Sequence, residues 1–279
     1  MNKIKILVCC HKDDIIIDNE PYTPIQVGKA VSKLNLGIIS DDTGDNISVK
    51  NPYYCELTAM YWAWKNLHDI EYIGLCHYRR YFDFHKQVKS YQSSKIVSSN
   101  DFRNIKLSLP LNLFSKIDNG AIYLAKHETY RCSNFLEYSC YHISDDMRTL
   151  QTLIENDGQR KYIEAFNDIM YRDNKLCPFN MFIMKKEKFD AYCEWLFHIL
   201  FRIEKMIDIS SYSTYQKRIF GFMGERLLNI YVKANDIKII ETPILLIDDN
   251  NTNRNLSFTK SVLNNIRANL SFMLVRPVK

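Results

Sequence analysis

Two short apolar segments of the chain each run directly into histidine and basic residues. Residues 4–10 precede His11 and Lys12, and residues 71–76 precede the run His77-Tyr78-Arg79-Arg80. Short, continuous apolar segments are typical of strands that are buried on both faces of a parallel sheet. Because α/β sheets bind ligands at the carboxyl ends of their strands, the pattern predicts an α/β fold whose site gathers these basic side chains.

Composition narrows the class of protein further. The 279 residues suffice for one large domain or two small ones, and 46% hydrophobic with 25% charged residues excludes a disordered chain. With only 8 Gly and 7 Pro, propellers and glycine-rich solenoids are disfavoured. The net charge of +5 suits an anionic ligand or an anionic membrane surface, but it falls short of a dedicated nucleic-acid binder.

The cysteines and the apolar runs indicate the cellular compartment in which the protein functions. None of the 8 cysteines forms a C-x-x-C pair and most lie in apolar segments, which predicts reduced thiols in the cytoplasm and no zinc site. The apolar run 6–10 is too short for the core of a signal peptide, and no segment reaches the roughly 18 apolar residues of a membrane span. We expect a cytoplasmic protein, either soluble or bound peripherally to a membrane.

Apolar residues at every third or fourth position predict the main helices. The clearest three cover residues 51–67, 189–206 and about 214–233. Gly221 and Gly224 lower the stability of the last of these helices, so we expect a distortion near Glu225.

These elements predict one domain over residues 1–255. Two shorter helices form a predicted helical insertion at about 130–175. Residues 256–279 combine apolar residues with Lys and Arg, which predicts a basic amphipathic tail.

The basic run after the second apolar segment is the strongest candidate for chemistry. The neighbouring guanidinium groups of Arg79 and Arg80 can neutralise a diphosphate through bidentate hydrogen bonds, with His77 beside them. At ~4 Å each Arg–phosphate contact is worth about 4 kcal/mol at an effective dielectric of about 20, before desolvation. The alternatives are a solvated turn or ion pairs with structural carboxylates.

Two other groups of polar residues have two interpretations each. His11 and Lys12 either bind a phosphate or form an exposed charged turn. Asp42, Asp45 and Asn46, in the acidic run 41–46, either bind a metal or sugar hydroxyls, or form an Asp/Gly turn.

Three polar residues in the second half of the chain, Asn180, Glu225 and Arg226, also have two interpretations each. Glu225, in an apolar helix, is either a general base of raised pKa or part of a structural pair with Arg226. Asn180, in an apolar strand, is either a ligand contact or a buried amide that the backbone satisfies. No P-loop, dinucleotide-binding glycine motif, G-x-S-x-G or H-E-x-x-H is present, so none of the stronger motif-based assignments applies.

Several runs of the chain, in order over about residues 3–245, closely resemble one bacterial family. It is the domain-of-unknown-function 4422 family of capsular, exopolysaccharide and O-antigen gene clusters, which includes galactofuranosyltransferases. The family commonly has Ser at the position of Gly224, and residues 127–134 match its basic-aromatic pattern only loosely. The matching runs are Pro24-Ile25-Gln26-Val27-Gly28, residues 41–48, Asn51-Pro52, residues 54–59, residues 72–82, residues 180–186, Tyr215-Gln216-Lys217-Arg218, Phe220-Gly221-Phe222 and Glu225-Arg226-Leu227.

The resemblance implies a GT-A-like glycosyltransferase fold, an α/β fold with a Rossmann-type mixed sheet flanked by helices. Such enzymes usually carry an Asp-x-Asp metal motif at the end of a central strand, where this chain has His77-Tyr78-Arg79. We therefore expect cationic side chains in place of the metal carboxylates and assign no metal ligand. The acidic run 41–45 leaves Mn²⁺ or Mg²⁺ binding open.

The implied reaction is an inverting transfer of a hexose, galactofuranose first, from a UDP-sugar to a glycan acceptor in capsular polysaccharide or O-antigen synthesis. Glu225 is expected to act as the base, with Arg79 and Arg80 on the leaving diphosphate. The expected nucleotide and donor-sugar contacts are His11, Lys12, Asp42, Asp45, Asn46 and His77, and the expected acceptor contacts are Asn180 and Arg226.

The expected partners are the UDP-sugar, a lipid-linked or oligosaccharide acceptor and, through the tail, the inner membrane, with no nucleic acid. Two alternatives stay open. A catalytically inactive nucleotide-sugar sensor requires the same donor contacts, and an RNA-binding protein can use the same Arg, Lys and Tyr side chains.

Overall fold

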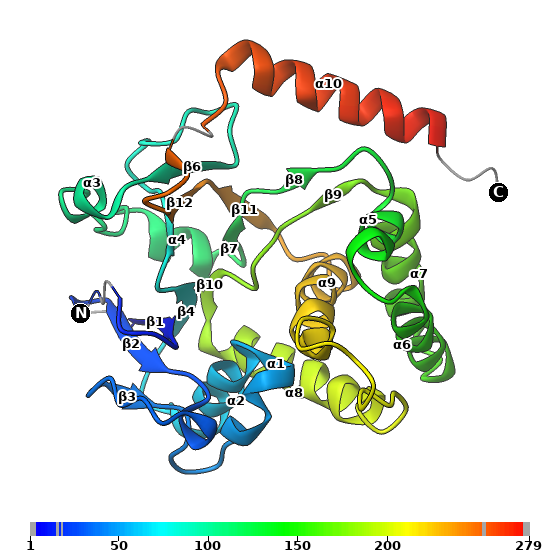
Figure 1. Cartoon of the computed structure of the whole chain (residues 1–279), viewed down its shortest axis with the longest axis horizontal. Helices are drawn as coiled ribbons and strands as arrows, with labels where there is room; N and C mark the ends of the chain where they lie inside the picture. Colours follow the sequence, from blue (N-terminus) through cyan, green and yellow to red (C-terminus); the bar gives the residue numbers. More distant parts are fainter. Residues whose placement is uncertain (1–3, 15–16, 18, 253–254, 276–279) are drawn as a thin grey trace.

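The computed structural model describes residues 4–14, 17, 19–252 and 255–275. In this part of the chain a ten-stranded mixed sheet is flanked by helices (Figure 1). In spatial order its main strands are β11 (Ile239–Thr242), β7 (Ile122–Ala125), β10 (Phe182–Lys185), β4 (Tyr72–His77), β1 (Ile4–Cys10), β2 (Tyr22–Gln26) and β3 (Ile39–Ser40). The strands β5 (Arg80–Phe82), β12 (Ile244–Ile247) and β6 (Ser94–Val97) branch from β4.

The two apolar segments that precede the basic residues are buried strands, as predicted, and they are neighbours in the sheet. β1 pairs in parallel with β4 and with β2, whereas β10 runs antiparallel to β4. Leu7 and Cys9 pack on one face of the sheet, and Ile6 and Val8 belong to the core on the other face. Because both faces are covered, the consecutive positions 6–10 of β1 are all apolar and buried, rather than every second one.

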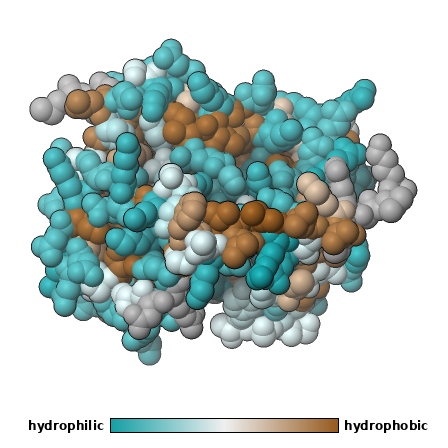
Figure 2. Space-filling model, turned by 90° about the horizontal axis from the view of Figure 1, so that it is seen from above, coloured by the Kyte–Doolittle hydropathy of each residue, from teal (hydrophilic) through white to brown (hydrophobic). Residues whose placement is uncertain are grey.

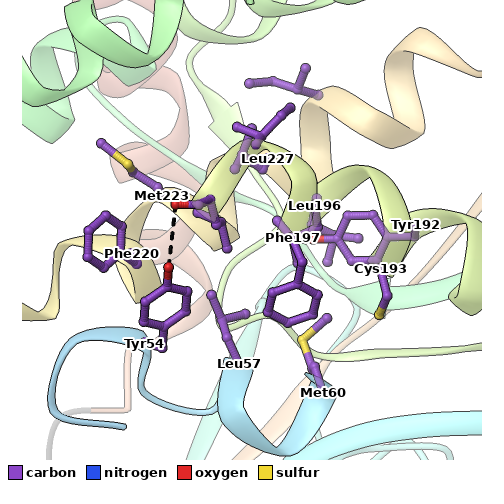
Figure 3. Close-up of a cluster of buried hydrophobic side chains, with 14 of the residues drawn as sticks. Tyr54, Leu57, Met60, Tyr192, Cys193, Leu196, Phe197, Phe220, Met223 and Leu227 are labelled. Carbon is purple, nitrogen blue, oxygen red and sulfur yellow. Dashed lines mark hydrogen bonds between the residues drawn. The ribbon is translucent and has the colours of Figure 1, made fainter. Parts of the chain in front are cut away.

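The larger core lies between the sheet and four helices. These are α1 (Asn51–Tyr54), α2 (Leu57–Asn66), α8 (Lys186–Ile203) and α9 (Ile219–Ala234). Figure 3 shows Leu57 and Met60 of α2 meeting Phe197 of α8 and Met223 of α9. The opposite face is covered in part by α3 (Ser99–Arg103) and α4 (Leu113–Asp118), through Phe102, Leu113 and Ile117.

β8 (Glu128–Thr129) and β9 (Lys175–Leu176) pair to form a small separate ribbon. The segment of chain that connects these two strands forms a helical layer. Its helices are α5 (Asn134–Tyr141), α6 (Ser144–Asn156) and α7 (Arg160–Asn167), followed by a π-helical turn, Asp168–Arg172. The last helix, α10 (Phe258–Val275), runs along one side of the molecule, past β8 (Figure 1). The final residues of the predicted tail, 276–279, lie outside the described residues.

Two helix predictions need correction. The helix expected over 51–67 is broken at Cys55, whose φ of 52° separates α1 from α2. The distortion expected near Glu225 is wrong, because α9 is continuous from Ile219 to Ala234. Its glycines serve close packing instead: a Cβ at Gly221 would lie 3.0 Å from the Sγ of Cys55, and one at Gly224 2.9 Å from Leu57 Cδ1.

Candidate active site

A cleft of about 790 Å³ opens at the carboxyl ends of β1 and β4. Its walls come from these strand ends, from α1, and from β8, α5 and α9 across the opening. The predicted site residues that line it are His11, His77, Arg79, Arg80, Glu225 and Arg226. Lys12, Asp42, Asp45, Asn46 and Asn180 are not among its lining residues.

The two neighbouring arginines differ in what they contact. Nε and one terminal nitrogen of Arg79 donate to Oδ2 of Asp14, at 2.8 and 2.5 Å, and the side chain is 51% exposed at the rim. This hydrogen bond raises the pKa of Arg79. Arg79 therefore fits the alternative in which an arginine of this run forms an ion pair with a carboxylate of the protein.

Arg80 points its guanidinium at the cleft instead. The group lies 4.5 Å from the centre of the Phe179 ring, and no carboxylate in the described residues forms an ion pair with it. A cation held over a ring face, with its N–H groups uncommitted to an acid, is poised for an anionic ligand.

Sequence reasoning missed a second such cation, Arg218. It is the last residue of the 3₁₀ turn Gln216–Arg218 before α9. Its Nε donates to the Sγ of Cys55 at 3.3 Å, and its guanidinium lies 5.4 Å from the centre of the Phe222 ring. It too has no carboxylate ion pair within the part of the chain described. Its only sequence cue was its place in the run 215–218 that matched the family, since 138 residues separate it from Arg80 along the chain.

The two histidines at the strand ends, His11 and His77, are neutral. Burial, followed by the charge of Arg80, lowers the pKa of His77 to about 3, and its Nε2 donates to the carbonyl of Phe179 at 2.7 Å. Burial and the nearby Lys12, Arg218 and Arg79 lower the pKa of His11. Both can therefore offer hydrogen bonds at neutral pH but no positive charge.

Glu225 and Arg226 form the pair that one interpretation expected. Oε2 of Glu225 accepts from Arg226 at 2.9 Å, and the other terminal nitrogen of Arg226 contacts Glu137 at 3.2 Å. Burial raises the pKa of Glu225, while Arg226 opposes the shift. The pairing does not remove Glu225 from the cleft, because its side chain remains 22% exposed there.

A second carboxylate, Glu56, was not singled out from the sequence. The break at Cys55 sets it at the start of α2, where its Oε1 accepts from Nδ2 of Asn180 at 2.6 Å. Burial raises its pKa, and Arg80 and Arg218 are the cations that oppose the shift. Asn180 is fully buried with a φ of 51°, so it positions Glu56 rather than contacting a ligand itself.

The acidic run 41–46 is occupied by contacts within the protein. Asp41 is fully buried and accepts from the backbone of Gly28 and Lys29 and from the hydroxyls of Ser48 and Thr58. Further contacts join Asp42 to Ser40, Asp45 to Tyr61, and Asn46 to Gly44 and Ser48. The structure does not bring these predicted donor contacts to the cleft, and the turn interpretation accounts for their geometry.

The side chains at the position of the usual metal motif do not suit a divalent cation of the GT-A type. The position of the usual Asp-x-Asp motif carries His77, Tyr78 and Arg79, with Arg80 next to it. Mn²⁺ and Mg²⁺ prefer oxygen ligands, and the guanidinium groups repel them. Among the described residues there is also no group of three or more His, Cys, Asp and Glu side chains arranged to hold a metal.

A family model matches most of the chain. Residues 5–236 match the family described as Domain of unknown function (DUF4422), and the chain belongs to it. None of the curated proteins matches the chain.

One solved structure shows the class of fold to which the chain belongs. The chain is similar to the apo structure of WbbM, described as a bifunctional glycosyltransferase, with 31% identity and a TM-score of 0.80. The match covers 88% of this chain and 46% of the WbbM chain, so this chain spans about half of that protein. The predicted glycosyltransferase fold, a Rossmann-type mixed sheet flanked by helices, is confirmed.

Proposed function

We propose that the protein is a glycosyltransferase that moves a hexose from a UDP-sugar to a glycan acceptor with inversion. The family resemblance favours galactofuranose as the hexose and capsular polysaccharide or O-antigen synthesis as the setting. The similarity to WbbM supports the reaction class. The observation that carries the proposal is one cleft that holds, in the described residues, two cations without acidic partners and a half-buried carboxylate, Glu225, of raised pKa.

Arg80 and Arg218 form the proposed diphosphate site. They come from different elements, β5 and the turn before α9, and both line the cleft together with Glu56, His11 and His77. Together the two guanidinium groups match the two charges of a diphosphate ester, and they offset the further charge that develops on UDP as it leaves. Arg79 is a rim contact because Asp14 already compensates its charge.

Glu225 is the proposed general base. Its carboxylate removes the proton of an acceptor hydroxyl while that oxygen forms a bond to the anomeric carbon of the donor. The bond from this carbon to the diphosphate oxygen breaks, and UDP leaves with the bonding electrons. Arg226 holds the Glu225 carboxylate in place, and neutral His11 and His77 donate or accept hydrogen bonds near the phosphates.

A thermal-shift panel tests the donor class. UDP and UDP-hexoses are expected to raise the melting temperature by several degrees, since a ligand at a hundred times its Kd stabilises the folded state by about 2.7 kcal/mol. Adenine nucleotides and free galactose serve as controls, and each ligand is measured with and without Mn²⁺. Release of UDP from UDP-galactofuranose, UDP-galactose and UDP-glucose is then followed by chromatography.

The outcomes separate the candidate functions. Binding of UDP with donor turnover supports the transferase, while binding without any turnover or transfer indicates a nucleotide-sugar sensor. No shift with any uridine nucleotide, together with salt-dependent binding to oligonucleotides, indicates an RNA-binding protein and rejects the proposal.

We also propose that α10 holds the enzyme at the anionic inner face of the membrane, where a lipid-linked acceptor is available. The helix exposes a stripe of apolar side chains, visible across the face shown in Figure 2. Residues 255–275 include Lys260 and Arg267 and no acidic residue, which complements anionic lipid. The stripe consists of Leu263, Ile266, Leu270, Met273 and Leu274, which are 48–86% exposed. No helix in the described residues is long and apolar enough to cross a membrane.

Co-sedimentation with liposomes tests this attachment. The full chain is expected to bind vesicles that contain phosphatidylglycerol, and the double variant Ile266→Asp, Leu270→Asp to lose about tenfold or more of that binding, because two carboxylates enter the lipid-facing stripe. Leu111→Asp, which introduces a carboxylate at a fully exposed leucine outside α10, is the matched control. Unchanged binding after deletion of residues 256 onward would count against the proposal.

A further inference from the structure

Beyond Arg218 the wall of the cleft becomes aromatic. The Phe222 ring lies 5.4 Å from the Arg218 guanidinium and 4.0 Å from the ring of His142. The Tyr215 ring stacks on His142 at 5.7 Å and lies 5.2 Å from the Phe222 ring, so the three rings form one cluster. Tyr215 is 50% exposed and Tyr141, also on this wall, is 63% exposed. Large rings that face a water-filled cleft without apolar cover are typical of a surface that binds a ligand.

The same end of the cleft contains a polar group without a partner. Nδ1 of His142 is buried and has no hydrogen-bond partner in the described part of the chain. Burial and the charge of Arg226 lower the pKa of His142 to about 4, so its ring is uncharged at neutral pH. This aromatic wall therefore adds no positive charge to the region.

Three carboxylates stand beside the aromatic wall. Glu128 of β8 accepts from the hydroxyl of Tyr130 at 3.3 Å, and Glu137 and Glu225 share the single guanidinium of Arg226. After burial and the Tyr130 hydrogen bond, the charges of Glu225 and Glu137 are the next influences on the pKa of Glu128, and they raise it. The three acids therefore lie close enough to interact. Arg226 forms ion pairs with two of them, and the charge of Arg80 also opposes the rise in the pKa of Glu128 and Glu225.

The part of the cleft formed by β8 and α5 presents carboxylate oxygens and aromatic faces. Arg218 borders this wall, 5.4 Å from the Phe222 ring, but in the described residues neither Arg218 nor Arg80 forms an ion pair with its carboxylates. Hydroxyl groups donate hydrogen bonds to carboxylates, and the C–H face of a sugar ring packs on an aromatic ring. A sugar that itself carries a carboxylate would meet like charges at short range.

We infer that the wall formed by Tyr215, Tyr141 and His142, together with Glu128 and Glu137, is the acceptor subsite and that it selects an uncharged sugar over a uronic acid. This inference rests on the proposed function, because Glu225 can deprotonate an acceptor only if the acceptor sugar lies against this wall.

Binding of matched glycosides tests the inference without requiring turnover. The probes are the methyl glycosides of glucose, galactose and mannose and the three corresponding uronides, which differ only in the C6 carboxylate. Affinities are measured by saturation-transfer NMR on the full chain saturated with UDP. At least one neutral glycoside is expected to bind about tenfold or more tightly than its uronide, because the uronide adds a like charge beside Glu128 and Glu137.

Variants show whether this wall is responsible. Tyr215→Ala is expected to weaken binding of the neutral glycoside about tenfold, and Tyr215→Phe, which keeps the ring, to weaken it by much less. Leu111→Ala alters an exposed side chain outside the cleft and should bind as the parent does. Glu128→Gln should narrow the difference between glycoside and uronide. Melting temperatures of all variants establish that they are folded.

Three results overturn the inference: uronides that bind as well as the neutral sugars, no binding of any neutral glycoside, or unchanged binding by Tyr215→Ala. The UDP-induced thermal shift is recorded on the same samples. Loss of that shift rejects the donor site of the proposed function, whereas a normal shift with any of these three results rejects the acceptor subsite alone.

Discussion

Glu225→Gln is expected to abolish glycosyl transfer while the Kd for UDP stays within about twofold. The amide keeps the shape of the side chain but cannot accept the proton of the acceptor hydroxyl, and general-base catalysis typically contributes 10²–10⁴-fold. UDP affinity should survive because Arg80 and Arg218, not Glu225, form the proposed diphosphate site. Transfer is measured by product formation from UDP-galactofuranose, and UDP binding by calorimetry.

The second carboxylate of the cleft is the natural control. Glu56→Gln keeps a polar group beside Asn180, so turnover should fall by much less than in Glu225→Gln. If Glu225→Gln transfers the sugar at the normal rate and Glu56→Gln does not transfer it at all, Glu56 is the general base. In the parent enzyme, activity should fall as the pH drops through the raised pKa of Glu225, because the base acts only when deprotonated.

Arg80→Ala and Arg218→Ala are each expected to lower kcat/KM by about 30- to 150-fold and to weaken UDP binding. This corresponds to the roughly 2–3 kcal/mol of a charge-assisted hydrogen bond that is made to the diphosphate and strengthens as the charge develops. Calorimetry with UDP and steady-state kinetics measure the two effects separately.

Arg79→Ala distinguishes the two neighbouring arginines. Since Asp14 already compensates the charge of Arg79 at the rim, its loss should change UDP affinity by no more than a few-fold. If Arg79→Ala is as damaging as Arg80→Ala, or if neither Arg80→Ala nor Arg218→Ala changes UDP binding, the diphosphate site lies elsewhere.

The strands and helices were predictable because their causes lie within short stretches of chain. β1 and β4 follow from continuous apolar runs, and α8 from apolar residues at every third or fourth position, since each pattern records which faces of the element are covered. The break at Cys55 was not predictable, because it depends on Gly221 and Gly224 of α9, which let α1 and α2 approach closely.

The functional residues also divide into those that the sequence predicts and those that only the tertiary structure reveals. That basic side chains gather at the end of β4 follows from residues 71–80 alone, because a strand must deliver what comes next in the chain to its carboxyl end. Which arginine remains available for a ligand depends on partners far away in the sequence: Asp14 occupies Arg79, the Phe179 ring supports Arg80, and the turn before α9 brings in Arg218. Local patterns determine the elements of a fold, but the charge balance of a cleft is a sum over residues that only packing brings within a few ångströms of one another.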